Sequence, residues 1–275
     1  MQKIWLLSDL SSTAVHAHRT FLQNCKTLPW PHLKVSLIHA WHPSRAGRFQ
    51  PIHIDEYLEQ SVNLALNEER LALLSEFPGL MEDISLIFPK GEIHEVIEEL
   101  AAEASPDLIV IGGRTKSWFA KLVSGLTTYK LWQHAPCPVL VIPEHVNRIV
   151  SKNVVCTSQL CAEPVSAAIR QVVNLIRTFG CNLYVYHAWT KEPPDISQLD
   201  EKLQQVAQGV NYEIITEENY RTTDGLTEFA QNMEAGILIL SLKDENYLTH
   251  LFRINVTSRI EALLPSALLL VKPSD

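Results

Sequence analysis

Residues 107–115 read Asp107-Leu108-Ile109-Val110-Ile111-Gly112-Gly113-Arg114-Thr115, and this stretch is the strongest indication of the fold in the sequence. A short apolar, β-branched run that leads directly into two glycines is typical of a buried strand ending in a tight turn. Glycines at such a turn allow the backbone to approach a ligand closely. We expect a helix to open near Gly125-Leu126-Thr127-Thr128, where free N–H groups and hydroxyls can bind phosphate oxygens. The stretch therefore predicts a strand, turn and helix of an open α/β sheet, with a candidate anion site at the carboxyl end of the strand.

The same parts occur twice along the chain. His39-Ala40-Trp41 recurs as His187-Ala188-Trp189, and residues 107–111 are matched by residues 236–240. The second copy keeps the order of the parts but lacks about 19 residues between its second and third strands. A chain of 275 residues is long enough for two domains. We therefore expect tandem domains over residues 1–145 and 150–275, joined by a linker near residues 144–150.

Short apolar runs alternate with amphipathic segments in both copies. This alternation predicts an α/β fold made of two tandem, open, mostly parallel five-stranded sheets of Rossmann-like type, with helices on both faces. In the first half we expect strands near 3–8, 33–39, 84–88, 107–112 and 138–142 and helices over 55–77 and 93–104; in the second half we expect helices over 164–177 and 226–233. If the strand order follows that of the protein family that this sequence resembles, as described below, the last strands, at 139–142 and 268–271, lie at sheet edges. Because bare apolar edges invite association, we expect them to pair with each other within the chain.

The composition is that of an ordinary globular protein, with 46% hydrophobic and 20% charged residues. The formal net charge of −8 disfavours nucleic acid as a partner, since phosphate backbones require clustered Lys and Arg. No apolar stretch is long enough for a membrane helix or a signal peptide, so we expect a cytoplasmic protein. The five cysteines form no CxxC pair and are expected to be buried, reduced thiols.

Residues 134–141, His134-Ala135-Pro136-Cys137-Pro138-Val139-Leu140-Val141, carry the most specific motif of the chain. Together with the glycines upstream, this segment resembles the universal stress protein family. The signature of that family is Gly-x2-Gly-x9-Gly-(Ser/Thr), followed by a helix and a tail of this sequence. The resemblance covers nearly all of the first half and includes Asp9 after the first strand and Gly91 after the third.

The resemblance implies a stress-response protein with an adenine nucleotide α hydrolase-like fold. It implies that the protein binds ATP or a related adenine nucleotide, with Mg, at one site per chain at most. The implied mode of action is binding and regulation of a protein partner that the sequence does not identify, with at most weak ATPase activity. Asp9 and Ala40 would flank adenine and ribose, and the phosphate path would be lined by Gly112, Gly125, Thr127 and Thr128, with Arg114 and Thr115 nearby.

The chain departs from the family signature at two positions. The second signature glycine falls on Thr115, and Leu126 takes the place of Ser or Thr after Gly125. A β-branched residue is strained wherever the loop requires a positive φ. These departures leave open an alternative function, a nucleotide-free protein-interaction scaffold in which both sites have decayed. A hydrolase or nucleotidyl transferase on the same fold is a third, weaker alternative.

The second half lacks the residues of the candidate site. Matching the two halves places Ser158 at the position of Asp9 and Ser241 at that of Gly112. Asp244, Ile254 and Asn255 take the places of Thr115, Gly125 and Leu126, and Asp244 would bring a negative charge near any phosphate. We therefore expect a degenerate domain with a structural or partner-binding role. If the halves pair within one chain, the protein can be a monomer, or a homodimer through another face.

Two further groups of polar residues were weighed as candidate sites. His39 and His42, and likewise His16 and His18, have spacings found among metal ligands, but no Cys or carboxylate cluster completes either pair. We expect no metal site, and we expect these histidines to lie in loops or on the surface, with His39 in a strand-end packing role. Ser8, Asp9, Ser11 and Ser12 lack the context of a catalytic nucleophile and are expected to form a turn and a helix cap.

Overall fold

A computed structural model describes residues 2–26, 32–41, 54–113, 130–131, 133–149, 152–158, 167–189, 191–218, 222–241 and 266–271. The first half contains β1 (Gln2–Leu7), α1 (Ser12–Cys25), β2 (Leu33–Ile38), α2 (Ile54–Glu76), β3 (Ile84–Ile87), α3 (Ile93–Glu103), β4 (Leu108–Gly113) and β5 (Val139–Pro143). The second half contains β6 (Asn153–Thr157), α7 (Ala167–Phe179), β7 (Asn182–Trp189), α8 (Ser197–Val206), β8 (Tyr212–Glu218), α9 (Thr222–Asn232), β9 (Ile237–Ser241) and β10 (Ala267–Val271).

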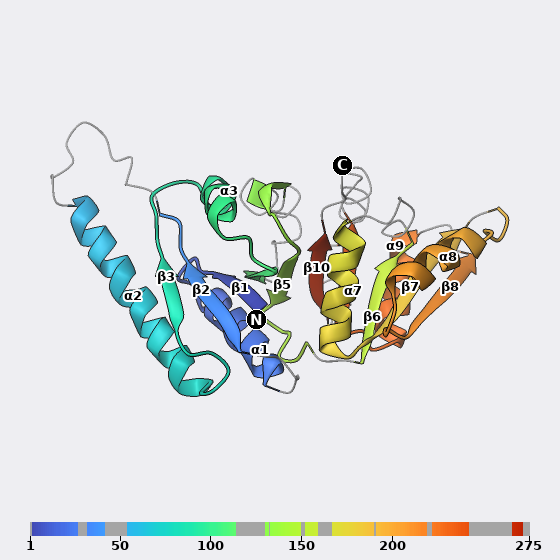
Figure 1. Ribbon diagram of the computed structural model, residues 1–275, viewed down its shortest axis with the longest axis horizontal. Helices are drawn as coiled ribbons and strands as arrows, with labels where there is room; N and C mark the ends of the chain where they lie inside the picture. The colour runs from blue at the N-terminus through green and yellow to red at the C-terminus, as the bar shows by residue number, and fades with distance from the viewer. Residues whose placement is uncertain are drawn as a thin grey trace.

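The strands form one ten-stranded sheet in the order β3-β2-β1-β4-β5-β10-β9-β6-β7-β8 (Figure 1). Each half is a parallel five-stranded sheet with the same strand order, which confirms the predicted fold class. The halves meet at β5 and β10, which pair antiparallel with Leu269 opposite Leu140. The predicted pairing of the two apolar edge strands within one chain is therefore confirmed.

Helices cover both faces of this sheet. α1 and α2 pack on one face, and their counterparts α7 and α8 in the second half pack on the same face. α3 and α9 pack on the opposite face. The strands serve both layers because successive side chains point to opposite sides of a strand; in β5, Leu140 and Ile142 belong to the first layer and Val139 and Val141 to the second.

The helices agree with their predicted ranges to within a few residues, and they explain the length difference between the two halves. α2 has 23 residues, whereas its counterpart α8 has 10. The residues missing from the second half between its second and third strands thus shorten this helix. α1 and α8 were not among the predicted helices.

The segment between the two halves packs against α1. Val146 and Ile149 are buried, and the Val146 carbonyl accepts a hydrogen bond of 3.0 Å from Nε2 of His16. The backbone N–H of Ile149 donates to the side-chain oxygen of Asn24 at 3.3 Å. The predicted linker region is therefore fixed to the first half up to Ile149.

Candidate functional site

The structure brings three predicted site residues to one edge of the sheet. Asp9 follows β1, Ala40 follows β2 and Gly112 lies near the end of β4, and these three strands are neighbours. The order of the strands reverses between β1 and β4. Open α/β sheets bind ligands in the crevice at such a reversal of strand order. The other predicted site residues, Arg114, Thr115, Gly125, Thr127 and Thr128, lie outside the described part of the chain.

A turn of four residues, Ser8 to Ser11, fixes the Asp9 carboxylate. Its Oδ1 accepts a hydrogen bond of 3.0 Å from the backbone N–H of Ser11 and a second from the Ser11 hydroxyl. Ser11 is also the N-cap of α1, where its oxygen accepts from the N–H of Ala14 at 3.3 Å. Leu10 between them has a φ of 61°, which is uncommon for a non-glycine residue. The predicted turn and helix cap are confirmed, and they leave the Asp9 side chain exposed at the sheet edge.

Gly112 is required by the close approach of β4 to the first turn of α1. A Cβ atom at this position would lie 2.6 Å from the carbonyl oxygen of Thr13 and 3.0 Å from the backbone nitrogen of Ala14. The sequence suggested that this glycine makes room for a ligand. The structure gives it a packing role instead, since helix backbone occupies the space beside it.

A buried polar network lies behind the turn and was not foreseen. His18 is fully buried on α1, with its Nδ1 2.6 Å from Oε1 of Glu69 on α2 and its Nε2 3.1 Å from the carbonyl oxygen of Leu7. The other Glu69 oxygen, Oε2, accepts from the Ser8 hydroxyl at 3.3 Å. Each ring nitrogen of His18 thus lies within hydrogen-bonding distance of an acceptor oxygen. The network ties α1 and α2 to the end of β1.

The expectation that His16 and His18 lie in loops or on the surface is wrong for His18, which is fully buried on α1, whereas His16 lies half-buried on the same helix. His39 does have the expected strand-end role, since its Nδ1 donates to the Ser8 carbonyl at 2.8 Å. His42 lies outside the described residues. The burial of His18 could have been recognised from its place among Ala14, Ala17 and Phe21, which follow helical spacing on the buried face of α1.

A second residue that sequence reasoning missed is Glu144. It follows β5, and its Oε1 accepts a hydrogen bond of 2.6 Å from the Thr13 hydroxyl in the first turn of α1. No local sequence pattern predicts this contact, because it joins residues that are far apart in the sequence. Glu144 adds a second exposed carboxylate to the edge where Asp9 lies.

The corresponding edge of the second half is simpler. Ser158 follows β6, and its hydroxyl lies 2.7 Å from Nδ1 of His187 at the end of β7. A neutral hydroxyl thus stands where the first half has the Asp9 carboxylate. Ser241 ends β9 in place of Gly112, while Asp244, Ile254 and Asn255 lie beyond the described residues.

The four cysteines that the structure describes are buried and have no nucleophilic setting. Burial raises the pKa of Cys25 and Cys137 far above the ordinary thiol value and that of Cys181 to about 11. Cys156 is buried as well, and Cys161 is not among the described residues. In the described part of the chain, no three His, Cys, Asp or Glu side chains are grouped so that they could hold a metal ion. No helix described here has the length and apolar character needed to cross a membrane.

An open parallel sheet with helices on both faces, repeated with the same strand order, defines a duplicated α/β protein of Rossmann-like type. Comparison with protein families identifies the relationship: the Universal stress protein family matches residues 1–143. The match covers more than half of the chain, and the chain therefore belongs to this family.

Solved structures extend the likeness of fold to both halves. A universal stress protein from Archaeoglobus fulgidus DSM 4304 superposes with a TM-score of 0.71 at 14% identity, covering 99% of this chain and 97% of that one. A putative universal stress protein from Pseudomonas aeruginosa UCBPP-PA14 gives a TM-score of 0.51 at 15% identity, covering 99% and 94%. A comparison with curated protein sequences found no match.

Proposed function

We propose that this protein is a stress-response binding protein that holds ATP or a related adenine nucleotide in its first half. In this proposal residues 1–145 and 150–275 form two domains, and the second serves a structural or partner-binding role in the cytoplasm. The observation that supports a site is the convergence of Asp9, Ala40 and Gly112 at the carboxyl edge of β1, β2 and β4.

The described residues suit the ribose and the adenine amine of such a ligand. The Asp9 carboxylate is exposed and oriented by Ser11, so it can accept hydrogen bonds from ribose hydroxyls or from the adenine amine. Ala40, with only a methyl side chain, follows β2 at the same edge. The family signature implies that the phosphates would contact Gly125, Thr127 and Thr128, with Arg114 and Thr115 nearby.

The same edge of the sheet also suits a metal ion bound to the nucleotide. Mg²⁺ bound to a triphosphate needs one or two hard oxygen ligands, and the carboxylates of Asp9 and Glu144 provide such oxygens at this edge.

The decisive experiment is titration calorimetry of the purified protein with Mg-ATP, together with mass analysis of any nucleotide released on denaturation. We expect about one nucleotide per chain. Asp9→Ala should weaken binding about tenfold or more, the loss expected for a hydrogen-bonded charge. Ser158→Ala is the matched control, because it changes the same position of the second half and should leave affinity unchanged.

A second substitution tests the phosphate region. Gly125→Glu places a carboxylate where the phosphates are proposed to bind and should abolish binding, while the far-ultraviolet circular dichroism stays that of the wild type. The corresponding change in the second half, Ile254→Glu, should not alter the affinity. If Gly125→Glu bound Mg-ATP as tightly as the wild type, the site assignment would be wrong.

The alternative, a nucleotide-free interaction scaffold, is favoured by one structural observation. Packing against Thr13 and Ala14 is sufficient to explain why residue 112 is glycine, so this glycine is no independent sign of a ligand. Absence of both binding and carried nucleotide would select this alternative, with Thr115 and Leu126 as marks of a decayed site. A turnover assay that yields no product would exclude the third alternative, an enzyme.

A further inference from the structure

The large apolar side chains that are exposed within the described residues all gather in one region. They are Leu10 (38% exposed), Tyr57 (71%), Leu64 (66%) and Leu71 (55%). Tyr57, Leu64 and Leu71 follow one another at intervals of seven residues on α2, so they lie along one side of the helix. We call these three residues the α2 stripe. Single exposed apolar residues are common, but a row of them on one helix marks a surface that another molecule covers.

The fold itself does not use the α2 stripe. Leu66 and Leu73, which are fully buried, lie on the opposite side of the same helix and attach it to the sheet. A surface helix normally has one apolar side and one polar side, whereas α2 has two apolar sides. Figure 1 shows α2 at the outer end of the sheet, beyond β3, where the side away from the sheet faces outward.

A groove between α1 and α2 continues the α2 stripe. It has a volume of about 300 Å³, and its walls include Leu10, Val15, Ala65 and Ala72. Ala65 and Ala72 directly follow Leu64 and Leu71 in the helix and are turned by about 100° from them, so groove and stripe are neighbouring apolar strips of α2 with Glu68 between them. Leu10 presents its side chain there from a left-handed backbone conformation, which is unfavourable for leucine.

The charges around this surface are predominantly negative. Glu56 and Glu68 of α2 are exposed, and Glu68 lies in the groove wall beside the stripe. The nearby basic groups are engaged within the chain, because Arg19 pairs with Glu76 at 3.0 Å and Arg70 pairs with Asp83 at 2.5 Å. A second copy of this surface would bring like charges together. A partner with basic flanks would instead be attracted.

We propose that the α2 stripe and the α1–α2 groove dock a basic amphipathic helix of a partner protein. Such a helix would lay its apolar side along Leu64 and Leu71 and towards the groove, with Lys or Arg facing Glu56 and Glu68. The surface also touches the candidate nucleotide site through Leu10, which follows Asp9 directly in the turn.

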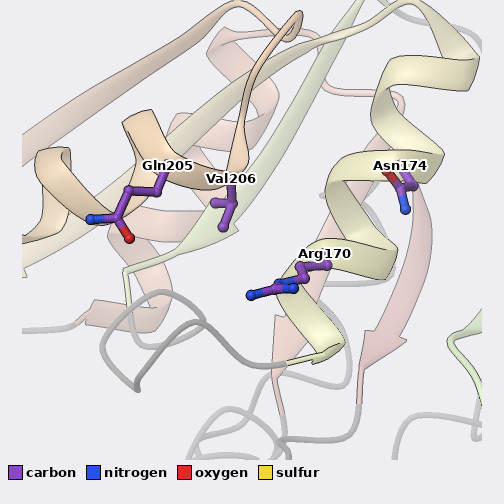
Figure 2. A pocket seen from close by; sticks show the side chains of 4 residues that line it. All are labelled: Arg170, Asn174, Gln205 and Val206. Atoms are coloured by element: carbon purple, nitrogen blue, oxygen red, sulfur yellow. The ribbon is translucent and has the colours of Figure 1, made fainter.

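The second half offers an internal contrast. The groove between α7 and α8 has a similar volume, about 380 Å³, but is lined by Arg170, Asn174, Gln205 and Val206 (Figure 2). Arg170 and Asn174 come from α7, and Gln205 and Val206 come from α8. Three of the four are polar, and none of the exposed large apolar residues of the described chain lies in this half. The docking surface therefore belongs to the first half.

The test measures the binding of a designed probe to the full chain by fluorescence anisotropy. The probe is a labelled helical peptide of about 18 residues, long enough for stable turns, with leucines along one side and lysines elsewhere. A peptide with glutamate in place of lysine is the control. We expect the lysine peptide to bind and the glutamate peptide to bind at least tenfold more weakly.

Two variants separate docking from simple charge attraction. The double variant Leu64→Asp/Leu71→Asp removes two apolar anchors and adds two negative charges, so docking on the α2 stripe predicts binding weakened about tenfold or more. Charge attraction alone predicts tighter binding. Asn174→Asp/Gln205→Asp adds the same charge to the α7–α8 groove, and it should leave the affinity within about twofold.

Three outcomes would overturn the proposal: no binding of the lysine peptide, equal binding of the two peptides, or unchanged or tighter binding by Leu64→Asp/Leu71→Asp. A fourth is a wild-type dimer in sedimentation that becomes monomeric in this variant, since the stripe would then be covered by a second copy. Both leucines are exposed, so the variant should keep the wild-type unfolding midpoint. Leu64→Gln/Leu71→Gln serves in its place if it does not.

Discussion

The two halves share their strand order but differ at the edge where a ligand would bind. In the first half the turn after β1 presents Asp9 and is secured from behind by the buried His18–Glu69 pair. In the described residues of the second half, a contact between Ser158 and His187 lies at the same place. Glu69 lies in the last third of the 23-residue α2, and the shorter α8 provides no such anchor in the contacts described for it. Strand order and apolar packing are thus shared by the two halves, whereas the polar contacts described at the edge differ between them.

Among substitutions that test this comparison, the largest losses of stability are expected where the two halves meet. Leu140 and Leu269 face each other across β5 and β10 and are 1% and 3% exposed. Leu140→Ala and Leu269→Ala should each lower the free energy of unfolding by about 2–5 kcal/mol, since both leave a cavity in the same layer. Urea unfolding would measure this. Losses below about 1 kcal/mol, or a large loss for only one variant, would show that the junction is not shared equally.

Breaking the buried His18–Glu69 pair should cause the second largest loss of stability. Glu69→Ala leaves the fully buried His18 without its partner and should lower the free energy of unfolding by about 3 kcal/mol or more. Ser158→Ala, which removes the single side-chain contact at the matching edge, should lower it by only about 1 kcal/mol. Equal losses in urea unfolding would mean that the two edges are held with similar strength after all.

The contact of Gly112 with α1 should have a smaller effect. Gly112→Ser introduces the residue that the second half carries at this position and should lower the free energy of unfolding by about 1–3 kcal/mol, because its Cβ meets the Thr13 carbonyl. The converse change, Ser241→Gly, should lower it by no more than about 1 kcal/mol, the usual effect of glycine in a strand or helix. Thermal or urea unfolding of both variants would compare them. A stable Gly112→Ser protein would imply that α1 can shift away from β4.

The smallest effects should appear at the two outer strands, at opposite ends of the pH scale. The Arg70 hydrogen bond, helped by the Ile84 N–H, lowers the pKa of Asp83 beside β3. Partial burial, followed by the hydrogen bond to Asp200 on α8, raises the pKa of Tyr212 at the start of β8 to about 12. The Asp83 contact therefore stabilises the fold above its unfolded pKa of about 4 and is lost as the pH falls through the lower folded value. The Tyr212 contact stabilises it below about pH 10 and is lost as the pH rises towards 12.

Carboxyl NMR signals would report Asp83, with Arg70→Met as the control that returns it to the ordinary range. The difference in absorbance at about 295 nm between wild type and Tyr212→Phe would isolate one tyrosine among the seven in the chain. Ordinary titration of either residue would show that the contact is absent in solution.

Much of the fold follows from local pattern. The buried strands are near-continuous apolar runs, and the strand order implied by the family resemblance places the last strand of each half at an edge, so even the pairing of β5 with β10 could be predicted. β8 could not be located, because its side chains are largely exposed and it has no apolar run. α1 was missed because Thr13, His18, Thr20 and Asn24 interrupt its buried side.

The site could be predicted only in part. Asp9, Ala40 and Gly112 were placed correctly at one edge, since strand ends of a parallel sheet lie together. Glu69 and Glu144 were missed because each acts across a gap of 51 or more residues, which no local spacing reveals. The packing of Gly112 against Thr13 was not foreseen, because sequence shows that a side chain is absent but not which atoms fill its place.

The antiparallel seam between β5 and β10 has a consequence for how the protein responds to dilution. Two separate chains that paired through these strands would come apart as their concentration fell. Here the partner strand is tethered to the same polypeptide, so its effective concentration is set by the length of the connection rather than by the amount of protein. The seam is therefore insensitive to expression level, and changes in protein abundance alter how many copies are present without altering how each copy is assembled.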